Sequence, residues 1–262
     1  MNLNRGEEAA KFGKWAFEKY REQLGENHPD TILALNNLVI VLGNLERYEE
    51  ALEFSQLLCA KRREQFGEDH QKTISALGDL SRIFDELGQY SDALEVNKRL
   101  LENKRRTLGE DHPETIHMLN TLAWSYHQCG DPIPGVQLIE RACQLAHENN
   151  SISTEEIISY EDTRAVLYAD VGRLEEAYTL ELSLIKKVQN EFAESKPLLA
   201  GCNFSAAYIC EKKQDHVSAL PYAEKAYPLF LEIFGQESKT TNECERMLDR
   251  IKVNVQSITS EI

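Results

Sequence analysis

Three closely similar segments decide the fold of this chain: Gly25-Glu26-Asn27-His28-Pro29-Asp30-Thr31, Gly67-Glu68-Asp69-His70-Gln71-Lys72-Thr73 and Gly109-Glu110-Asp111-His112-Pro113-Glu114-Thr115. Their first residues are 42 positions apart, and a second set of glycines, Gly88, Gly130 and Gly172, has the same spacing. Self-similarity at a fixed period of this length is typical of proteins built from stacked repeats. The chain is therefore read in units of 42 residues.

Each unit reads as two helices. The glycine of the quoted segment can adopt the left-handed conformation that ends a helix, and the proline suits the first turn of the next one. In the unit 25–66, apolar residues recur at helical spacing over about 29–42 and again over about 48–65. Neither helix can bury its apolar stripe alone, so neighbouring pairs are expected to stack.

The period predicts an all-α fold, a right-handed superhelical solenoid of antiparallel helix pairs with about twelve helices, forming one domain over residues 1–262. We expect an N-terminal half repeat, five repeats, and a capping helix with a tail. Their limits are 1–24, then 25–66, 67–108, 109–150, 151–192 and 193–234, and finally 235–262. The last helix is assigned as a cap because one side carries the apolar residues Cys244, Met247, Leu248, Ile251 and Val255.

Charge and hydropathy limit the classes of partner. The 262 residues include 44 acidic and 29 basic side chains, and the net charge of -15 argues against nucleic acid, which is bound through clustered Lys and Arg. No apolar stretch is long enough to span a membrane, and the first eleven residues lack the apolar core of a signal peptide. The sequence therefore predicts a cytoplasmic protein that binds neither nucleic acid nor membrane.

The six cysteines are scattered and contain no CxxC pair. Most lie among apolar helix positions, where a thiol behaves as a small hydrophobic group. We therefore expect a reducing compartment, no disulfide framework, no metal site and no cofactor.

The repeated motifs resemble the tetratricopeptide repeat family, in the 42-residue subtype of kinesin light chains. The family pattern corresponds here to His28-Pro29-Asp30-Thr31, Leu35-Asn36-Asn37-Leu38-Val39 and Tyr48-Glu49-Glu50-Ala51. The resemblance covers nearly the whole chain and is strongest over residues 25–142. It implies a non-enzymatic scaffold that binds a peptide or protein segment in a concave groove lined by the first helix of each pair.

The resemblance also implies which side chains face that groove. They are Asn36, Asn37, Ile40, Asp79, Arg82, His117, Asn120, Trp124, His127, Asp162 and Tyr208. An Asn amide can both donate to and accept from a peptide backbone, so Asn37 and Asn120 are the first candidates for that role. Either could instead bridge adjacent helices or be solvated. Trp124 is a candidate anchor, with an inter-repeat core tryptophan as the alternative.

The charges of the predicted groove favour a neutral or basic partner with an apolar anchor. The predicted groove contains two basic residues, Arg82 and Lys212, and four acidic ones, Asp79, Glu86, Asp162 and Asp170. The acidic cargo peptides of kinesin light chains are therefore not expected here. A monomer is favoured. Two alternatives remain open: a recognition segment of a larger multidomain effector, and a module that self-assembles through its terminal faces.

Two places break the repeat. Glu161 and Arg164 stand where other units have Leu119 and Leu122. We expect a shift of helical phase that leaves both exposed, because burying an unpaired charge is costly; a buried ion pair or a partner contact is the alternative. The segment 131–135 carries two prolines, which predicts a longer, shifted turn.

No catalytic motif emerges. The sequence contains no GxxxxGK[ST], HExxH or GxSxG pattern. His28, His70 and His112 recur with the repeat, which assigns them to the turn, not to a reaction. The sequence therefore predicts that the protein is not an enzyme.

Overall fold

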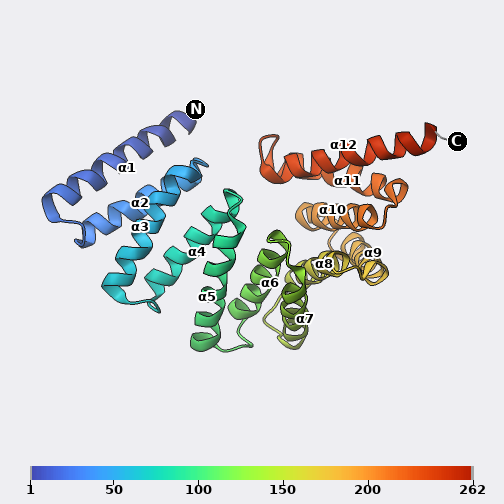
Figure 1. Ribbon diagram of the computed structural model, residues 1–262, viewed down its shortest axis with the longest axis horizontal. Helices are drawn as coiled ribbons and strands as arrows, with labels where there is room; N and C mark the ends of the chain where they lie inside the picture. The colour runs from blue at the N-terminus through green and yellow to red at the C-terminus, as the bar shows by residue number, and fades with distance from the viewer. Residues whose placement is uncertain (1, 261–262) are drawn as a thin grey trace. The chain divides into compact units, whose positions relative to one another are not determined.

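The computed structural model describes residues 2–260. Within that range the chain forms twelve α-helices and no strand, as expected for an all-α repeat protein (Figure 1). In chain order the helices are α1 (Asn2–Leu24), α2 (Pro29–Asn44), α3 (Tyr48–Phe66), α4 (Gln71–Glu86), α5 (Tyr90–Leu108), α6 (Pro113–Gln128), α7 (Pro132–Glu148), α8 (Thr154–Asp170), α9 (Leu174–Glu191), α10 (Lys196–Lys212), α11 (His216–Phe234) and α12 (Lys239–Ser260).

The helices keep the 42-residue register. We call α2, α4, α6, α8, α10 and α12 the A helices, and the others the B helices. From α3 onward, every B helix begins 42 residues after the previous one, at Tyr48, Tyr90, Pro132, Leu174 and His216. Three residues separate each of these helices from the A helix before it. Such short connections make the two helices of a pair antiparallel neighbours.

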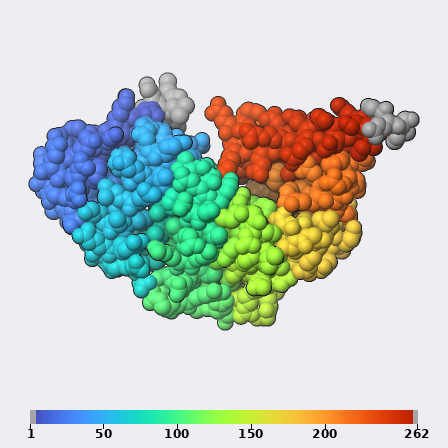
Figure 2. Space-filling view, in the orientation of Figure 1, coloured from blue at the N-terminus to red at the C-terminus, as the bar shows by residue number. Residues whose placement is uncertain are grey.

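The chain divides into two compact units, Met1–Gly109 and Glu110–Ile262. In the first unit, each of the helices α1 to α4 packs on the next one along the chain. In the second unit, α6 to α12 do the same, and neighbouring A helices also touch: α6 contacts α8, α8 contacts α10, and α10 contacts α12. The space-filling view shows α12 as an outer layer of this unit, against α11 (Figure 2).

One buried position with a small side chain recurs in every pair. Ala51, Ala93, Gly135, Ala177 and Ala219 lie 42 residues apart in the first turn of their B helices, and all are buried. At Gly135 a Cβ atom would lie 2.9 Å from the carbonyl oxygen of Ala123. The backbones of α6 and α7 therefore approach too closely for any larger residue at this point.

The expected longer turn at residues 131–135 is wrong. The helix α7 begins at Pro132, in the same register as the other B helices. The prolines at positions 132 and 134 lie in its first turn, where the backbone amides have no partner within the helix. The segment therefore fits the regular three-residue connection without disturbing it.

The recurring histidines cap helices. The Nδ1 atom of His28 accepts a hydrogen bond from the amide of Asp30, at 3.2 Å. His70 and His112 do the same for α4 and α6, at 3.1 and 3.2 Å. Each imidazole thus satisfies one of the amides that a helix start leaves without a partner. Their assignment to the turn is consistent with this geometry.

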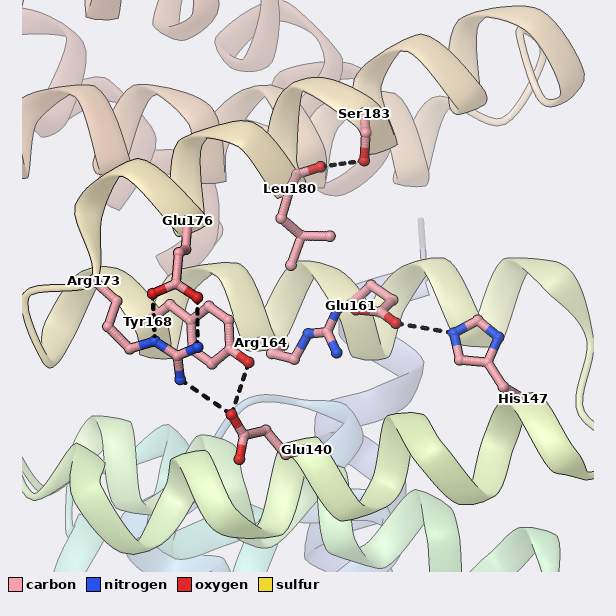
Figure 3. Close-up of polar contacts among 9 residues, drawn as sticks. All are labelled: Glu140, His147, Glu161, Arg164, Tyr168, Arg173, Glu176, Leu180 and Ser183. Atoms are coloured by element: carbon pink, nitrogen blue, oxygen red, sulfur yellow. Dashed lines mark hydrogen bonds and ion pairs between the residues drawn. The ribbon is translucent and has the colours of Figure 1, made fainter.

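Glu161 is buried, so the expected exposure of this residue is wrong. Its side chain is only 9% exposed and forms an ion pair with Arg164 one turn later on α8. Its Oε1 atom also lies 3.0 Å from Nε2 of His147 on α7 (Figure 3). The structure has an ion pair in which Glu161 is buried and Arg164 is half-buried, and two partners meet the carboxylate where a leucine stands in other units.

A second polar group lies nearby on the same helices (Figure 3). Glu140 of α7 accepts hydrogen bonds from the hydroxyl of Tyr168, at 2.7 Å, and from Arg173, at 3.1 Å. Arg173 also pairs with Glu176 of α9. Polar contacts thus connect α7, α8 and α9 beside the apolar core.

Candidate functional site

Four polar side chains of the second unit meet at the C-terminal ends of three A helices. They are His127 of α6, Asp170 of α8, and Tyr208 and Lys212 of α10, and we call them the Asp170 cluster. Asp170 and Lys212 occupy the same repeat position in successive units, 42 residues apart. Because α8 packs against both α6 and α10, this position brings the three helix ends together.

Asp170 is the centre of the cluster. Its Oδ2 atom is hydrogen-bonded to Nδ1 of His127, and its Oδ1 atom accepts from the hydroxyl of Tyr208. The Nζ atom of Lys212 lies 3.1 Å from Oδ1. The Asp170 side chain is 9% exposed, whereas that of Lys212 is 43% exposed. Asp170 is therefore a nearly buried carboxylate paired with a partly exposed lysine.

The ionisation of the cluster follows from these contacts. Burial by itself would raise the pKa of Asp170. The hydrogen bonds from His127, Tyr208 and Lys212 outweigh burial and lower that pKa overall. Burial and the neighbouring Asp170 carboxylate both raise the pKa of Tyr208. At neutral pH Asp170 is therefore charged and Tyr208 keeps its proton.

Aromatic rings surround this carboxylate. The Trp124 and His127 ring centroids are 4.6 Å apart, and the His127 and Tyr208 centroids are 6.1 Å apart at an interplanar angle of 84°. Trp124 is 39% exposed, so it is not a core tryptophan. The partly exposed indole ring of Trp124 therefore lies against the imidazole of His127, and Asp170 holds that imidazole in place.

The other predicted residues of the second unit are spread along the same helices. His117 is exposed, with its ring centroid 6.5 Å from that of Tyr160. Asn120 is half-buried, and its Oδ1 atom is buried without a hydrogen-bond partner. Asp162 is half-buried, but its carboxyl group turns inward, toward Glu181 of α9 and Cys202 of α10. Asp162 therefore does not belong to the Asp170 cluster.

The predicted residues of the first unit lie on α2 and α4. Asn37 and Ile40 are exposed one turn apart on α2. Asn36 is half-buried, and its Oδ1 atom accepts a hydrogen bond of 2.6 Å from Arg62 of α3. Asp79 is half-buried and Arg82 is exposed on α4, where the Arg82 guanidinium lies over Gly43 of α2. Asn37 and Ile40 are thus the accessible pair, while Asn36 serves a contact between helices.

The first unit also contains a pocket. It is lined by residues of α3, α4 and α5 and of the α3–α4 connection, including three arginines. Two of these are paired with acidic side chains of the connection: Arg63 with Glu68 and Arg106 with Asp69. Their charge is therefore largely neutralised within the unit, and none of the predicted site residues lines this pocket.

Sequence comparison identifies the repeats. A tetratricopeptide repeat family model matches residues 40–106. This segment therefore carries the tetratricopeptide repeat. No curated protein sequence matches it. Over the described residues, no helix is both long and apolar enough to cross a membrane.

Solved structures share the fold of these tetratricopeptide repeats. A putative kinesin light chain repeat protein of Podosopora anserina is 18% identical, with a TM-score of 0.62, and the match covers 78% of this chain and 97% of that one. BtubC (BKLC) of P. vanneervenii is 14% identical, with a TM-score of 0.61, covering 91% and 95%. A tetratricopeptide repeat protein of Parabacteroides merdae is 16% identical, with a TM-score of 0.51, covering 93% and 98%. At these identities the comparison concerns the fold.

Sequence reasoning named Trp124, His127 and Tyr208 as site residues, and the structure brings these three together. It placed Asp170 and Lys212 in the predicted groove but missed that they bind each other and organise the cluster. Their shared repeat position was the available signal. No such signal linked His127 to Asp170, because the two residues are 43 positions apart and therefore do not share a repeat position.

Proposed function

We propose that the protein binds an extended peptide segment of another protein along the A-helix face of its second unit, with Trp124 as the anchor. The observation that carries the proposal is the Trp124 ring, which is exposed yet fixed by His127 and Asp170. A rigid, partly exposed aromatic ring is typical of the residues that dominate binding energy at protein interfaces.

The charge of the protein supports a neutral or basic segment. Its net charge of -15 attracts basic partners over long range. On this face Lys212 is already paired with Asp170, so its charge offers little to an acidic ligand. The Lys212 side chain is 43% exposed, which leaves it open to displacement from Asp170 by a group of the partner. A lysine or arginine of the partner can therefore take the place of Lys212, while an adjacent apolar side chain lies on Trp124.

Synthetic peptides test the proposal. Three capped nonapeptides share a central leucine and differ in their flanking residues, which are lysines, glutamines or glutamates. The chain has two tryptophans, so the variant Trp15→Phe makes Trp124 the sole indole and its fluorescence reports binding. We expect affinity to fall in the order lysine, glutamine, glutamate. Equal affinities, or no change in Trp124 fluorescence with any peptide, would contradict the proposal.

A variant of the anchor provides the second test. The change Trp124→Ala removes the ring and should weaken binding of the lysine peptide, measured by titration calorimetry, by at least about tenfold, as for a central interface residue. Trp15→Ala is the matched control, since Trp15 is also exposed but lies on α1 of the first unit. The circular dichroism of both variants should equal that of the unmodified chain.

Self-association is a second candidate, and one specific surface favours it. Phe12 and Trp15 of α1 are 67% and 54% exposed, and their ring centroids are 5.5 Å apart. Exposed aromatic neighbours of this kind are common at protein interfaces. Light scattering over a range of concentrations tests the idea: a monomer at every concentration excludes it, whereas a dimer lost on Trp15→Ala supports it.

A further inference from the structure

Three potential metal ligands converge in the interior of the second unit. Asp162 of α8, Glu181 of α9 and Cys202 of α10 each direct one ligand atom to a common point, and these atoms all lie within 4.8 Å of one another. Glu181 is completely buried and Cys202 is 2% exposed. Three consecutive helices thus direct acidic or thiol groups to a region where the rest of the core is apolar.

Three of the four carboxyl oxygens in this cluster lack a hydrogen-bond partner. Both oxygens of Glu181 and the Oδ1 atom of Asp162 are buried without a partner. Among the described residues, the groups that influence their ionisation are Ser205, Cys202 and the two carboxyls themselves, with no basic side chain. Burying carboxylates in this way is very unfavourable unless a proton or a cation neutralises them.

A single shared proton does not resolve this arrangement. One proton between Asp162 and Glu181 would satisfy one oxygen of each and leave the second oxygen of Glu181 with only the weak thiol donor of Cys202 beside it. A cation can contact both carboxyl groups at once. The thiol of Cys202, at the same point, adds a ligand that a shared proton does not need.

We propose that Asp162, Glu181 and Cys202 form a binding site for one zinc ion. Zinc accepts carboxylate oxygens and cysteine sulfur together, whereas magnesium and calcium prefer oxygen ligands alone. In a tetrahedral zinc site the ligand atoms would lie about 3.3 to 3.6 Å apart, as follows from bonds of about 2.0 Å to oxygen and 2.3 Å to sulfur. Side-chain rotations that shift the ligand atoms by about 1 Å would bring the three groups to these distances.

One further residue supports the site. The Ser205 side chain, on α10, lies beside the Asp162 carboxyl group and can help to fix its orientation. On binding, Cys202 must release its thiol proton to solvent, and so must whichever carboxyl group is protonated in the metal-free chain, so that zinc is held by a thiolate and two carboxylates. The ion would join α8, α9 and α10.

Zinc-dependent stability tests the proposal. The full 262-residue chain is freed of metal with a chelator, dialysed, and unfolded by heat with and without one equivalent of zinc. We expect zinc to raise the Tm of the unmodified chain, and the rise to vanish in Glu181→Gln and Cys202→Ala. Cys210→Ala is the control, because Cys210 is another buried thiol of α10 and lies outside the cluster. It should keep the response.

Cobalt identifies the ligand. Cobalt(II) bound to a thiolate gives a charge-transfer band in the near ultraviolet, which the unmodified chain and Cys210→Ala should show and Cys202→Ala should lose. The zinc affinity of Cys202→Ala should fall by at least about a hundredfold. No zinc-dependent rise in Tm, or a cobalt band that persists in Cys202→Ala, would overturn the proposal. If Glu181→Gln instead stabilises a chain that ignores zinc, the carboxyl groups share a proton.

Discussion

The hydroxyl of Tyr208 on α10 donates a hydrogen bond to the carboxylate of Asp170 on α8. Asp170 also binds His127 of α6, so one buried carboxylate connects three successive A helices. Stacked repeats interact mainly with their nearest neighbours, and such a side chain adds a specific contact at each junction. The same carboxylate fixes the imidazole beneath Trp124. Stability and the proposed binding surface therefore depend on one residue.

The first prediction concerns acid stability. The pKa of Asp170 is lowered in the folded protein, so its contribution to stability is present above the ordinary value of 3.8 and is lost as the pH falls through the lower folded value. Asp170→Asn should reduce the free energy of unfolding by about 1 to 2 kcal/mol at pH 7. The difference from the unmodified chain should shrink below about pH 4.

Thermal unfolding of both proteins from pH 7 to pH 3 measures this difference. Asp249→Asn is the control, because Asp249 is exposed on α12, and it should have little effect at any pH. A deficit in Asp170→Asn that is as large at pH 3 as at pH 7 would show that the charge of Asp170 is not involved.

The fold followed from the sequence because it depends on positions that recur. The glycines, the capping histidines and the small residue of each B helix repeat every 42 residues, and the structure places them as the period requires. The contacts that distinguish this chain do not recur. Glu161 is buried because His147 and Arg164 reach it, and only the structure shows that all three side chains converge.

Only part of the candidate site could be predicted from the sequence. The repeat register places Trp124 and Tyr208 on A helices, and the shared position of Asp170 and Lys212 on neighbouring ones. It does not show that Asp162, expected in the groove, turns its carboxyl group inward. The direction of a side chain at the edge of an apolar stripe depends on the neighbouring helix, which periodicity within one helix does not describe.

Lys212 should compete with a basic ligand for Asp170. In Lys212→Gln the carboxylate loses its internal cation, so the lysine peptide should bind about three to ten times more tightly, while the glutamate peptide should not gain. Lys213→Gln changes the net charge equally but affects a side chain paired with Glu175. A similar gain in both variants would mean that only the overall charge matters.

The buried pair of Glu161 and Arg164 should be replaceable only as a pair. Arg164→Leu leaves Glu161 buried with His147 alone and should destabilise the protein by roughly 3 kcal/mol. The double variant Glu161→Leu with Arg164→Leu restores the pattern of the other units and should be about as stable as the unmodified chain. Urea unfolding compares the three proteins. A double variant less stable than Arg164→Leu alone would contradict this.

The histidine cap of α6 should act through its acceptor atom. His112→Ala removes the bond to the Glu114 amide and should reduce the free energy of unfolding by about 1 kcal/mol. His112→Asn supplies another acceptor at the same position and should recover most of this loss, as Asn is among the best capping residues. Equal losses in the two variants, measured by urea unfolding, would show that the imidazole ring matters for packing instead.

Adding one methyl group at Gly135 should harm the fold even though alanine occupies this position in the four other pairs. The new Cβ atom would lie 2.9 Å from the carbonyl oxygen of Ala123 and 3.3 Å from Cβ of Tyr126. Backbone atoms of a packed helix cannot yield cheaply, so α7 must move away from α6. We expect Gly135→Ala to reduce the free energy of unfolding by roughly 1 to 3 kcal/mol.

A second glycine makes this prediction specific. Gly201 lies within α10, and a Cβ atom there would meet nothing within 4 Å. Since alanine favours helix over glycine, Gly201→Ala should stabilise the same unit by up to about 1 kcal/mol. Urea unfolding of the two variants should therefore show opposite shifts. If Gly135→Ala is also stabilising, the distance between α6 and α7 is not set by this contact, and the glycine is a tolerated exception to the alanine of the repeat.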